Sequence, residues 1–147
     1  RYSFRERIPD GEFECPVLTV PKLGDNIDKL AICFTPRYKQ GFSLEPLRAY
    51  RDKLLFVGLP SEHEAFCREH FSVDYAPVLN ALEMLQLVSA CRGFVGNVSG
   101  TFAIMECAKV PRILCVEPNV GNVRPQGGIC FEARDEYALR NQLKQLI

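Results

Sequence analysis

One stretch organises the rest of the chain: Arg92-Gly93-Phe94-Val95-Gly96-Asn97-Val98-Ser99-Gly100-Thr101. Its apolar run is typical of a buried strand that ends at Val95, and Gly96-Asn97 is typical of a turn. A helical pattern follows, for which Ser99 is a suitable N-cap. The free backbone N–H groups of such a helix start attract anions, most often phosphates. The same residues also suit a plain turn and cap without a ligand, so this stretch alone leaves both interpretations open.

The composition predicts a globular domain. The chain has 147 residues, of which 47% are hydrophobic, and its 18 basic residues balance 18 acidic ones. This is enough to bury a core of its own. The balanced charge argues against a nucleic-acid partner, which requires a basic excess on one face. No apolar run approaches the roughly 18 residues that a membrane-spanning helix needs.

The cysteines indicate neither a zinc site nor a disulfide framework. There are seven of them, no CxxC motif occurs, and the two histidines stand apart from any paired cysteines. Cys33 and Cys115 lie in strand-like runs, and Cys91 and Cys107 lie on or beside apolar helix faces. We therefore expect buried, reduced thiols in a cytoplasmic protein, with no metal site. The chain does not begin with Met, and we expect a processed product or a fragment of a longer protein.

Strand and helix patterns alternate from residue 30 onward. Residues 1–29 lack periodicity and are expected to form an arm or linker, with a short edge strand at 15–20. The expected strands cover 30–34, 54–57, 73–75, 93–95, 111–116 and 129–131. The expected helices cover 43–50, 61–70, 80–91, 99–109 and 135–147. Their expected N-caps include Ser43, Ser61 with Glu64, and Asn80 with Glu83. This alternation predicts an α/β domain over 30–147, with a mostly parallel sheet of five to six strands and helices on both faces.

The strand-end loops are expected to share one site, because parallel sheets bind ligands at the carboxyl ends of their strands. The first loop, which runs from Thr35 to Gly41, offers Arg37 and Lys39, both cations suited to phosphate oxygens. The second loop offers Glu62, which can accept hydrogen bonds from a ribose hydroxyl pair. The fourth offers the helix start at 99–101. Together these loops favour a phosphate-bearing ligand. Turns are expected at Gly58, Gly96 and Asn97.

Several polar residues admit two interpretations. Glu117 follows the fifth strand and is as suited to a sugar hydroxyl as to plain solvent exposure. Glu106 can face the ligand or the helix surface. His63 more often belongs to a solvated helix face than to a site in such a position. Arg37 and Lys39 are also compatible with solvated loop cations. No Ser-His-Asp arrangement is visible, because neither histidine is a convincing base for Ser99.

Three segments together resemble a known family. They are Phe56-Val57-Gly58-Leu59-Pro60-Ser61-Glu62, Leu82-Glu83-Met84-Leu85-Gln86-Leu87-Val88-Ser89-Ala90-Cys91 and Phe94-Val95-Gly96-Asn97-Val98-Ser99-Gly100. The chain resembles, over about residues 30–118, the C-terminal half of GT-B glycosyltransferases, nearest the heptosyltransferase-like group. The resemblance is best over 82–111. It implies a three-layer Rossmann-like domain that holds a nucleotide-sugar donor.

The resemblance also implies roles for individual residues. Thr35 and Lys39 would meet the donor phosphates, Glu62 the ribose, and the Ser99-Gly100-Thr101 segment the pyrophosphate. Two positions depart from the family: Val98 stands where an Asp is common, and Phe102-Ala103-Ile104 lacks a His that is often found there.

The family's usual catalytic carboxylate lies in an N-terminal domain, for which residues 1–29 are too short. The resemblance therefore implies either a donor-binding half that lacks its acceptor domain or a relative that has lost the chemistry.

Two classes of function are carried forward. In the first, the domain belongs to a glycosyltransferase that moves a sugar from a nucleotide-diphosphate donor to a hydroxyl acceptor. No DxD carboxylate pair occurs, so Arg37, Lys39 and the helix start would stabilise the leaving diphosphate without a metal ion. In the second, the chain is a non-catalytic module of Rossmann or flavodoxin-like fold that binds a nucleotide or docks a protein.

Overall fold

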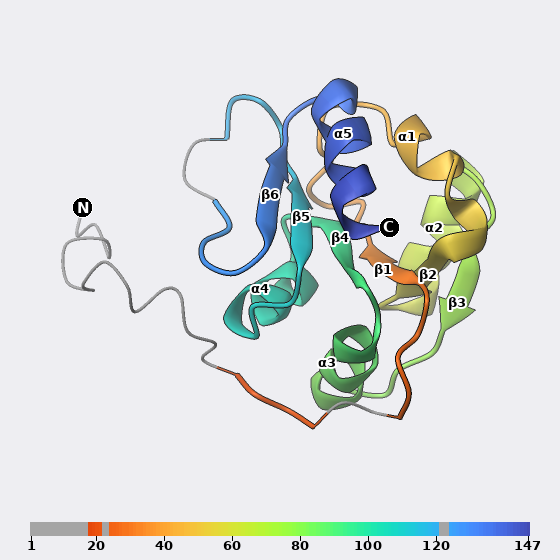
Figure 1. The fold of residues 1–147 in the computed structure, drawn as a ribbon. Coiled ribbons are helices and arrows are strands. Elements are labelled where there is room, and N and C mark those ends of the chain that lie inside the picture. Colours follow the sequence, from red (N-terminus) through yellow and green to blue (C-terminus); the bar gives the residue numbers. More distant parts are fainter. Residues whose placement is uncertain (1–17, 22–23, 121–123) are drawn as a thin grey trace.

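The computed structural model describes residues 18–21, 24–120 and 124–147 of the chain (Figure 1). Its strands are β1 (Leu30–Cys33), β2 (Leu54–Val57), β3 (Asp74–Ala76), β4 (Gly93–Asn97), β5 (Arg112–Cys115) and β6 (Cys130–Ala133). Its helices are α1 (Glu45–Arg48), α2 (Pro60–Glu69), α3 (Ala81–Ala90), α4 (Gly100–Cys107) and α5 (Glu136–Leu146), with a 3-10 turn η2 (Arg51–Lys53) before β2. The predicted alternation of strand and helix is confirmed.

The six strands form one sheet in the order β3-β2-β1-β4-β5-β6. Every neighbouring pair is parallel. The chain builds outward from β1 to β3, then returns to the other side of β1 and builds outward again from β4 to β6. The direction of building therefore reverses between β1 and β4, and such a reversal opens a crevice beyond the carboxyl ends of the two strands.

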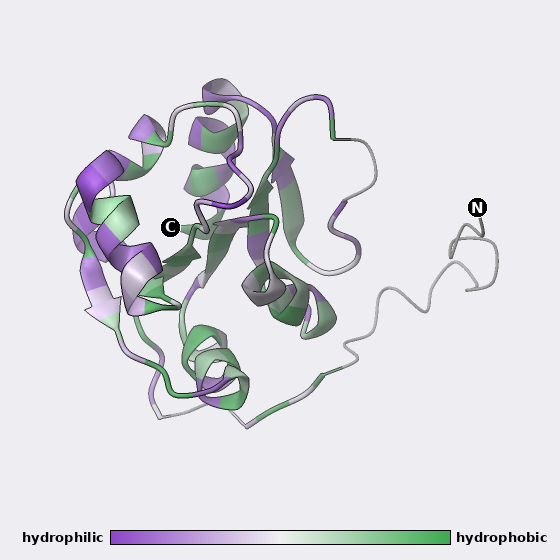
Figure 2. Cartoon of the chain, turned by 180° about the vertical axis from the view of Figure 1, so that it is seen from behind, coloured by the Kyte–Doolittle hydropathy of each residue, from purple (hydrophilic) through white to green (hydrophobic). Residues whose placement is uncertain are grey.

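Helices cover both faces of the sheet, so the fold is a three-layer Rossmann-like α/β fold (Figures 1 and 2). On one face, Leu30 and Ile32 of β1 pack with side chains of α1, α2 and α5. On the other face, Ala31 and Cys33 pack with side chains of α3 and α4. The alternation along β1 follows from the two-residue period of a strand. Because all of β1 is buried, its sequence is a continuous apolar run.

The expected turn at Gly96-Asn97 is wrong, because both residues belong to β4. Gly96 pairs with Cys33 of β1 on one side and with Leu114 of β5 on the other. A Cβ atom on Gly96 would lie 2.7 Å from the carbonyl oxygen of Cys33 and 2.8 Å from the Phe94 ring. The glycine is therefore required by close packing inside the sheet rather than by a turn.

The capping prediction for α2 is also wrong, whereas that for α3 is confirmed. Helix α2 begins at Pro60 with Leu59 as its N-cap, and Glu62 rather than Glu64 occupies the third helical position. Proline suits this first position because its missing N–H would have had no helical partner. In α3, the Asn80 side chain accepts a hydrogen bond from the N–H of Glu83 at 2.9 Å.

Smaller differences concern element lengths and the first residues of the chain. The helix expected over 43–50 is limited to α1, and its N-cap is Leu44 rather than the predicted Ser43, although the Ser43 hydroxyl accepts from the Glu45 N–H at 3.1 Å. The sixth strand covers 130–133 instead of 129–131. The edge strand expected at 15–20 lies outside the described residues up to 17, and 18–20 are not a strand. None of the described helices is long and apolar enough to cross a membrane.

Candidate functional site

A cavity of about 410 Å³ lies at the point where the strand order reverses. We call it the switch-point cavity. Its walls come from the loops that follow β1, β2 and β3 and from the first turns of α2, α3 and α4. It is lined by Thr35, Arg37, Tyr38, Gly58, Leu59, Glu62, Val78, Leu79, Asn80, Ala81, Met84, Ser99, Gly100 and Thr101. This size is typical of a small-molecule site. The structure thus brings together seven predicted site residues: Thr35, Arg37, Gly58, Glu62, Ser99, Gly100 and Thr101.

The start of α4 presents backbone N–H groups to this cavity. The Ser99 hydroxyl accepts from the N–H of Phe102 at 3.1 Å, which confirms Ser99 as the N-cap. Gly100 and Thr101 occupy the first turn, where N–H groups have no carbonyl partner within the helix. A Cβ atom on Gly100 would meet nothing within 4 Å. A ligand can therefore approach this backbone closely, and the helix dipole favours a negative charge there.

Asn97 anchors the loop that carries Thr35 and Arg37. It is 1% exposed, at the end of β4. Its side-chain oxygen accepts from the Thr35 N–H at 3.0 Å, and its amide nitrogen donates to the carbonyl oxygens of Thr35 at 2.7 Å and Tyr38 at 2.5 Å. Asn97 was predicted as a turn residue. Its position instead ties the loop after β1 to the neighbouring strand.

The two predicted loop cations have different surroundings. Arg37 is exposed and lines the switch-point cavity, and its guanidinium lies 5.5 Å from the centre of the Tyr38 ring. No carboxylate among the described residues forms an ion pair with it. Lys39 does not line this cavity; its ammonium lies 3.4 Å from a carboxylate oxygen of Glu69. Arg37 is therefore the cation that the structure places beside the start of α4.

Glu62 lines the cavity, but one of its oxygens is already engaged. Its Oε2 accepts from the N–H of Leu59 at 3.1 Å and so closes the first turn of α2. Gly58 has a φ of 138°, and a Cβ atom there would lie 2.9 Å from Glu62 Oε2. Gly58 thus has the turn geometry expected of it and makes room for the carboxylate. The described residues form no hydrogen bond with the other oxygen, Oε1.

Cys33 lies behind the cavity wall. It is 1% exposed, and its sulfur lies 3.9 Å from Glu62 Oε2 and 3.7 Å from Thr101 Oγ1. Burial, the largest effect, raises the pKa of this thiol to about 12. A protonated thiol at neutral pH is a weak nucleophile. Cys33 therefore packs against the cavity rather than attacking a ligand.

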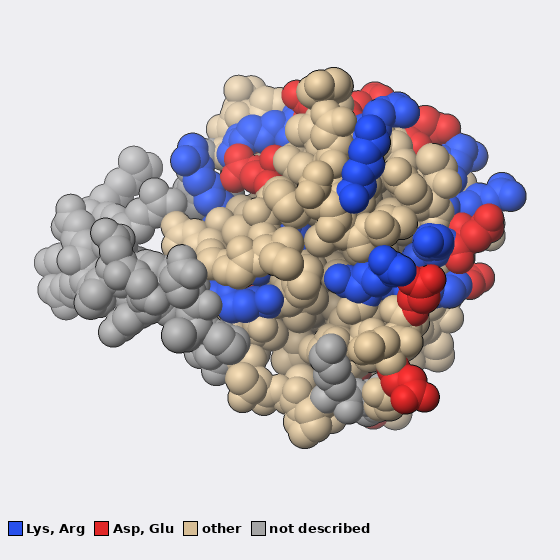
Figure 3. Space-filling view, viewed as in Figure 1, with Lys and Arg blue, Asp and Glu red and all other residues tan. Residues whose placement is uncertain are grey.

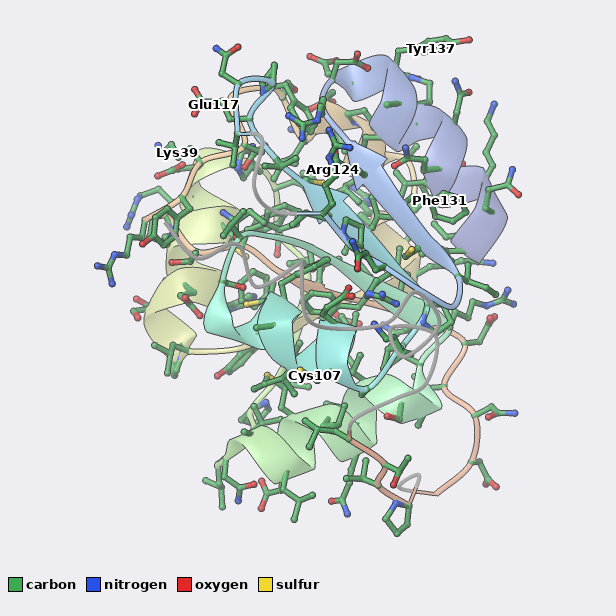
Figure 4. The ribbon with its side chains drawn as sticks, turned by 90° about the vertical axis from the view of Figure 1, so that its left-hand side faces the viewer. Lys39, Cys107, Glu117, Arg124, Phe131 and Tyr137 are labelled. Carbon is green, nitrogen blue, oxygen red and sulfur yellow. The ribbon has the colours of Figure 1, made fainter. Side chains whose placement is uncertain are left out.

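A second cavity, of about 590 Å³, lies beside the first and takes in Lys39 and Glu117. Arg37 and Tyr38 line both cavities, so the loop after β1 separates them. Figure 4 shows Lys39 and Glu117 at the same edge of the molecule, far from Cys107 at the other end of α4. Lys39 and Glu117 therefore line the second cavity and not the switch-point cavity, which Glu62 and the start of α4 line.

Sequence reasoning missed an apolar part of the switch-point cavity, made of Leu59, Val78, Leu79 and Met84. Two of these side chains are highly exposed, Leu59 by 62% and Leu79 by 90%. An available signal was Leu59, which stands at the start of a helix in the N-cap position, where polar residues are usual.

Two residues with open interpretations have structural partners. The Nε2 atom of His63 lies 3.0 Å from the Val73 carbonyl oxygen and 3.2 Å from the Cys67 sulfur, and its ring stacks on Tyr75. Glu106 forms ion pairs with Lys109 and Arg112. Neither lines the switch-point cavity.

The described residues contain neither a candidate metal site nor a disulfide. Within 18–21, 24–120 and 124–147, no cluster of three or more His, Cys, Asp or Glu side chains is arranged to hold a metal ion. The six cysteines in these ranges are free thiols.

Figure 3 shows acidic and basic side chains interspersed on the face in view.

Comparisons with known proteins returned no match, whether with a family model, a curated protein or a solved structure.

Proposed function

We propose that this domain binds the nucleotide-diphosphate part of a nucleotide-sugar donor and serves as the donor-binding domain of a glycosyltransferase. One observation carries the proposal. An exposed arginine without an ion-pair partner in the described chain, Arg37, shares a cavity with the first N–H groups of α4, at the switch point of a parallel sheet. Backbone N–H groups and a guanidinium are complementary to phosphate oxygens. The resemblance of 82–111 to GT-B glycosyltransferases supports a sugar nucleotide as the ligand.

In this proposal the diphosphate lies over Gly100 and Thr101. When the bond to the sugar breaks, negative charge grows on the departing diphosphate. Arg37 and the N–H groups of α4 then stabilise that charge without a metal ion, because they are already in place before the reaction. Lys39 adds to this only after it leaves Glu69.

The sugar is proposed to extend into the second cavity. Arg37 and Tyr38 line both cavities, so a ligand can pass from one to the other along this loop. Glu117 is exposed at the second cavity and can accept hydrogen bonds from sugar hydroxyls. In this proposal, the acceptor site and the catalytic base lie outside this domain.

Isothermal titration calorimetry with nucleoside diphosphates and the corresponding nucleotide sugars tests the proposal. Wild-type protein is expected to bind both, and Arg37→Met to weaken binding about tenfold or more through loss of a charge-assisted contact. Arg51→Met is the matched control, because Arg51 is an exposed cation on η2 away from both cavities.

Two results would redirect the proposal. No binding of any nucleotide at millimolar concentration contradicts it outright. A second result would be that the nucleotide sugar binds no more tightly than the diphosphate and that Glu117→Gln does not change its affinity. That result would show that the sugar adds no contact, and it favours a non-catalytic nucleotide-binding module instead.

A further inference from the structure

The turn that follows β5 carries Glu117 to the second cavity. It covers residues 117–120 and is closed by a hydrogen bond from the Val120 N–H to the Glu117 carbonyl oxygen at 3.1 Å. Just before it, the Val116 N–H donates to the carbonyl oxygen of Ala133 in β6 at 3.0 Å. Glu117 itself is exposed and lines the cavity, so burial of its own side chain contributes little to its position. The backbone of the turn therefore decides where the carboxylate lies.

Arg134, the residue after β6, holds this turn. Its Nη1 donates to the carbonyl oxygens of Glu117 at 3.1 Å and Pro118 at 2.6 Å, and its Nη2 donates to that of Val120 at 2.8 Å. Its Nε donates to a carboxylate oxygen of Glu132. All three guanidinium nitrogens are therefore engaged, and the planar fork fixes three carbonyl oxygens of one turn at the same time.

Arg134 acts from outside both cavities. It lines neither the switch-point cavity nor the second cavity. Its side chain is 26% exposed and that of Glu132 is 22% exposed, so water screens these bonds only in part. Hydrogen bonds from a charged donor are stronger than those between neutral groups. Arg134 can therefore influence a ligand in the second cavity only through the turn.

On the other side, Gly41 makes room for the Glu117 side chain. A Cβ atom on Gly41 would lie 3.1 Å from Glu117 Cγ, so the side chain packs directly against the glycine. The φ of Gly41 is 76°, in the left-handed region that glycine adopts without strain. Glu117 is thus held through its backbone by Arg134, and its side chain lies against the loop after β1.

We propose that Arg134 is a positioning residue for the sugar, because it keeps the Glu117 carboxylate at the second cavity before the ligand arrives. This inference rests on the proposed function, from which it takes the contact between Glu117 and the sugar. It adds that this contact depends on a residue that touches no ligand. Affinity gains from such an arrangement because the entropy of ordering the turn is lost on folding rather than on binding.

A double-mutant cycle by calorimetry tests the inference, with a nucleotide sugar and the matching nucleoside diphosphate as ligands. The cycle consists of wild type, Arg134→Met, Glu117→Ala and the double variant. Arg134→Met should lower the affinity for the nucleotide sugar about threefold to fivefold, as expected for a weakened hydrogen-bonding contact, and leave the affinity for the diphosphate unchanged. The double variant should bind the nucleotide sugar no more weakly than Glu117→Ala, because Arg134 then has no carboxylate to position.

Two further variants and one ligand-free measurement separate positioning from a general effect on the fold. Arg140→Met is the matched control, since Arg140 is an exposed cation on α5 that lines neither cavity, and it should change neither affinity. Arg134→Lys keeps the charge, but one ammonium cannot replace the fork, so it should lose nearly as much nucleotide-sugar affinity as Arg134→Met. Amide hydrogen exchange at Val120 should be faster in both Arg134 variants and unchanged at the start of α4.

The outcomes distinguish this inference from the proposed function. The positioning role is overturned, and the donor site stands, if Arg134→Met leaves the nucleotide-sugar affinity unchanged or if its loss adds to that of Glu117→Ala in the double variant. An equal loss of affinity for the diphosphate also overturns it, because that result shows a general effect on the fold. If wild type binds the nucleotide sugar no more tightly than the diphosphate, both this inference and the proposed sugar contact fail.

Discussion

Two of the arginines, Arg112 and Arg37, lie in opposite surroundings. Arg112 begins β5 and is 0% exposed. Its Nε lies 2.5 Å from a carboxylate oxygen of Glu106, and the other oxygen of Glu106 accepts from Lys109 at 3.0 Å. The remaining N–H groups of Arg112 donate to the carbonyl oxygens of Val110, Gln126 and Gly127.

Arg37, by contrast, projects beside open N–H groups at the opposite ends of the strands. It has no carboxylate partner within the described ranges, and its guanidinium meets only the Tyr38 ring. A buried charge must be paired, because leaving it unpaired costs several kcal/mol. The network around Arg112 therefore holds the structure together, whereas the unpaired groups around Arg37 are available to a ligand.

The largest expected effect would come from breaking the Arg112 network. Arg112→Met leaves the Glu106 charge without its main partner and should lower the free energy of unfolding by about 3–5 kcal/mol in urea denaturation. Arg37→Met should leave the stability unchanged within about 0.5 kcal/mol, since Arg37 is exposed. The double variant Arg112→Met with Glu106→Gln should recover part of the loss. A loss below about 1 kcal/mol for Arg112→Met contradicts the structural role.

A smaller effect is expected at Asn97, which joins the sheet to the ligand-binding loop. Asn97→Leu keeps the volume but removes the bonds to Thr35 and Tyr38, at an expected cost of about 2–3 kcal/mol in unfolding free energy. Nucleotide affinity should fall as well, because the loop that holds Arg37 loses its anchor. For comparison, Asn80→Ala removes the cap of α3 and should cost about 1 kcal/mol. Unchanged nucleotide affinity in Asn97→Leu would show that the loop does not need this anchor.

Two glycines sharpen the comparison within one short segment. Gly96→Ala places a methyl group 2.7 Å from a backbone oxygen and should lower the unfolding free energy by about 1–3 kcal/mol. Gly100→Ala meets open space and should be neutral, or stabilising by up to about 1 kcal/mol, because alanine favours a helix. The methyl group should nevertheless weaken diphosphate binding, since it occupies space that a phosphate needs. Thermal denaturation compares the stability of the two variants, and calorimetry compares their affinity for a nucleoside diphosphate. A Gly96→Ala variant that is more stable than Gly100→Ala would contradict the close packing around Gly96.

The smallest effect concerns pH. Burial opposes ionisation of Glu106, but the bonds from Arg112, the Gln126 N–H and Lys109 together hold its pKa below the ordinary value of 4.5. The ionised carboxylate therefore stabilises the fold above the ordinary pKa, and this contribution disappears as the pH falls through the lowered value. Urea midpoints at pH 7 and at about pH 3.5 should differ more for wild type than for Glu106→Gln. An equal change of the urea midpoint in the two proteins would show that Glu106 does not contribute to the loss of stability in acid.

Much of the fold was predictable because buried parallel strands carry an unmistakable pattern. The runs at 30–34 and 54–57 are continuously apolar, since helices cover both faces of the sheet. The N-caps Asn80 and Ser99 were predicted because their side chains bond within three residues. These are local effects, and local effects are visible in a sequence.

What the sequence could not supply depends on contacts between distant residues. Gly96 looked like a turn residue, although it is small because Cys33, 63 positions away in the sequence, packs against it. Lys39 and Arg37 looked equivalent, and only the structure places Glu69 beside one of them. The apolar part of the switch-point cavity was missed for the same reason, because Leu59 and Leu79 follow different strands.

The most direct test of the account is a nuclear magnetic resonance titration of the labelled protein with a nucleoside diphosphate, observing backbone amide signals. The largest changes are expected at Gly100 and Thr101, with smaller changes in the loop that carries Arg37 and unchanged signals at Arg112. Saturable binding that leaves the Gly100 and Thr101 amides unmoved, or that moves only signals around Arg112, would contradict the account.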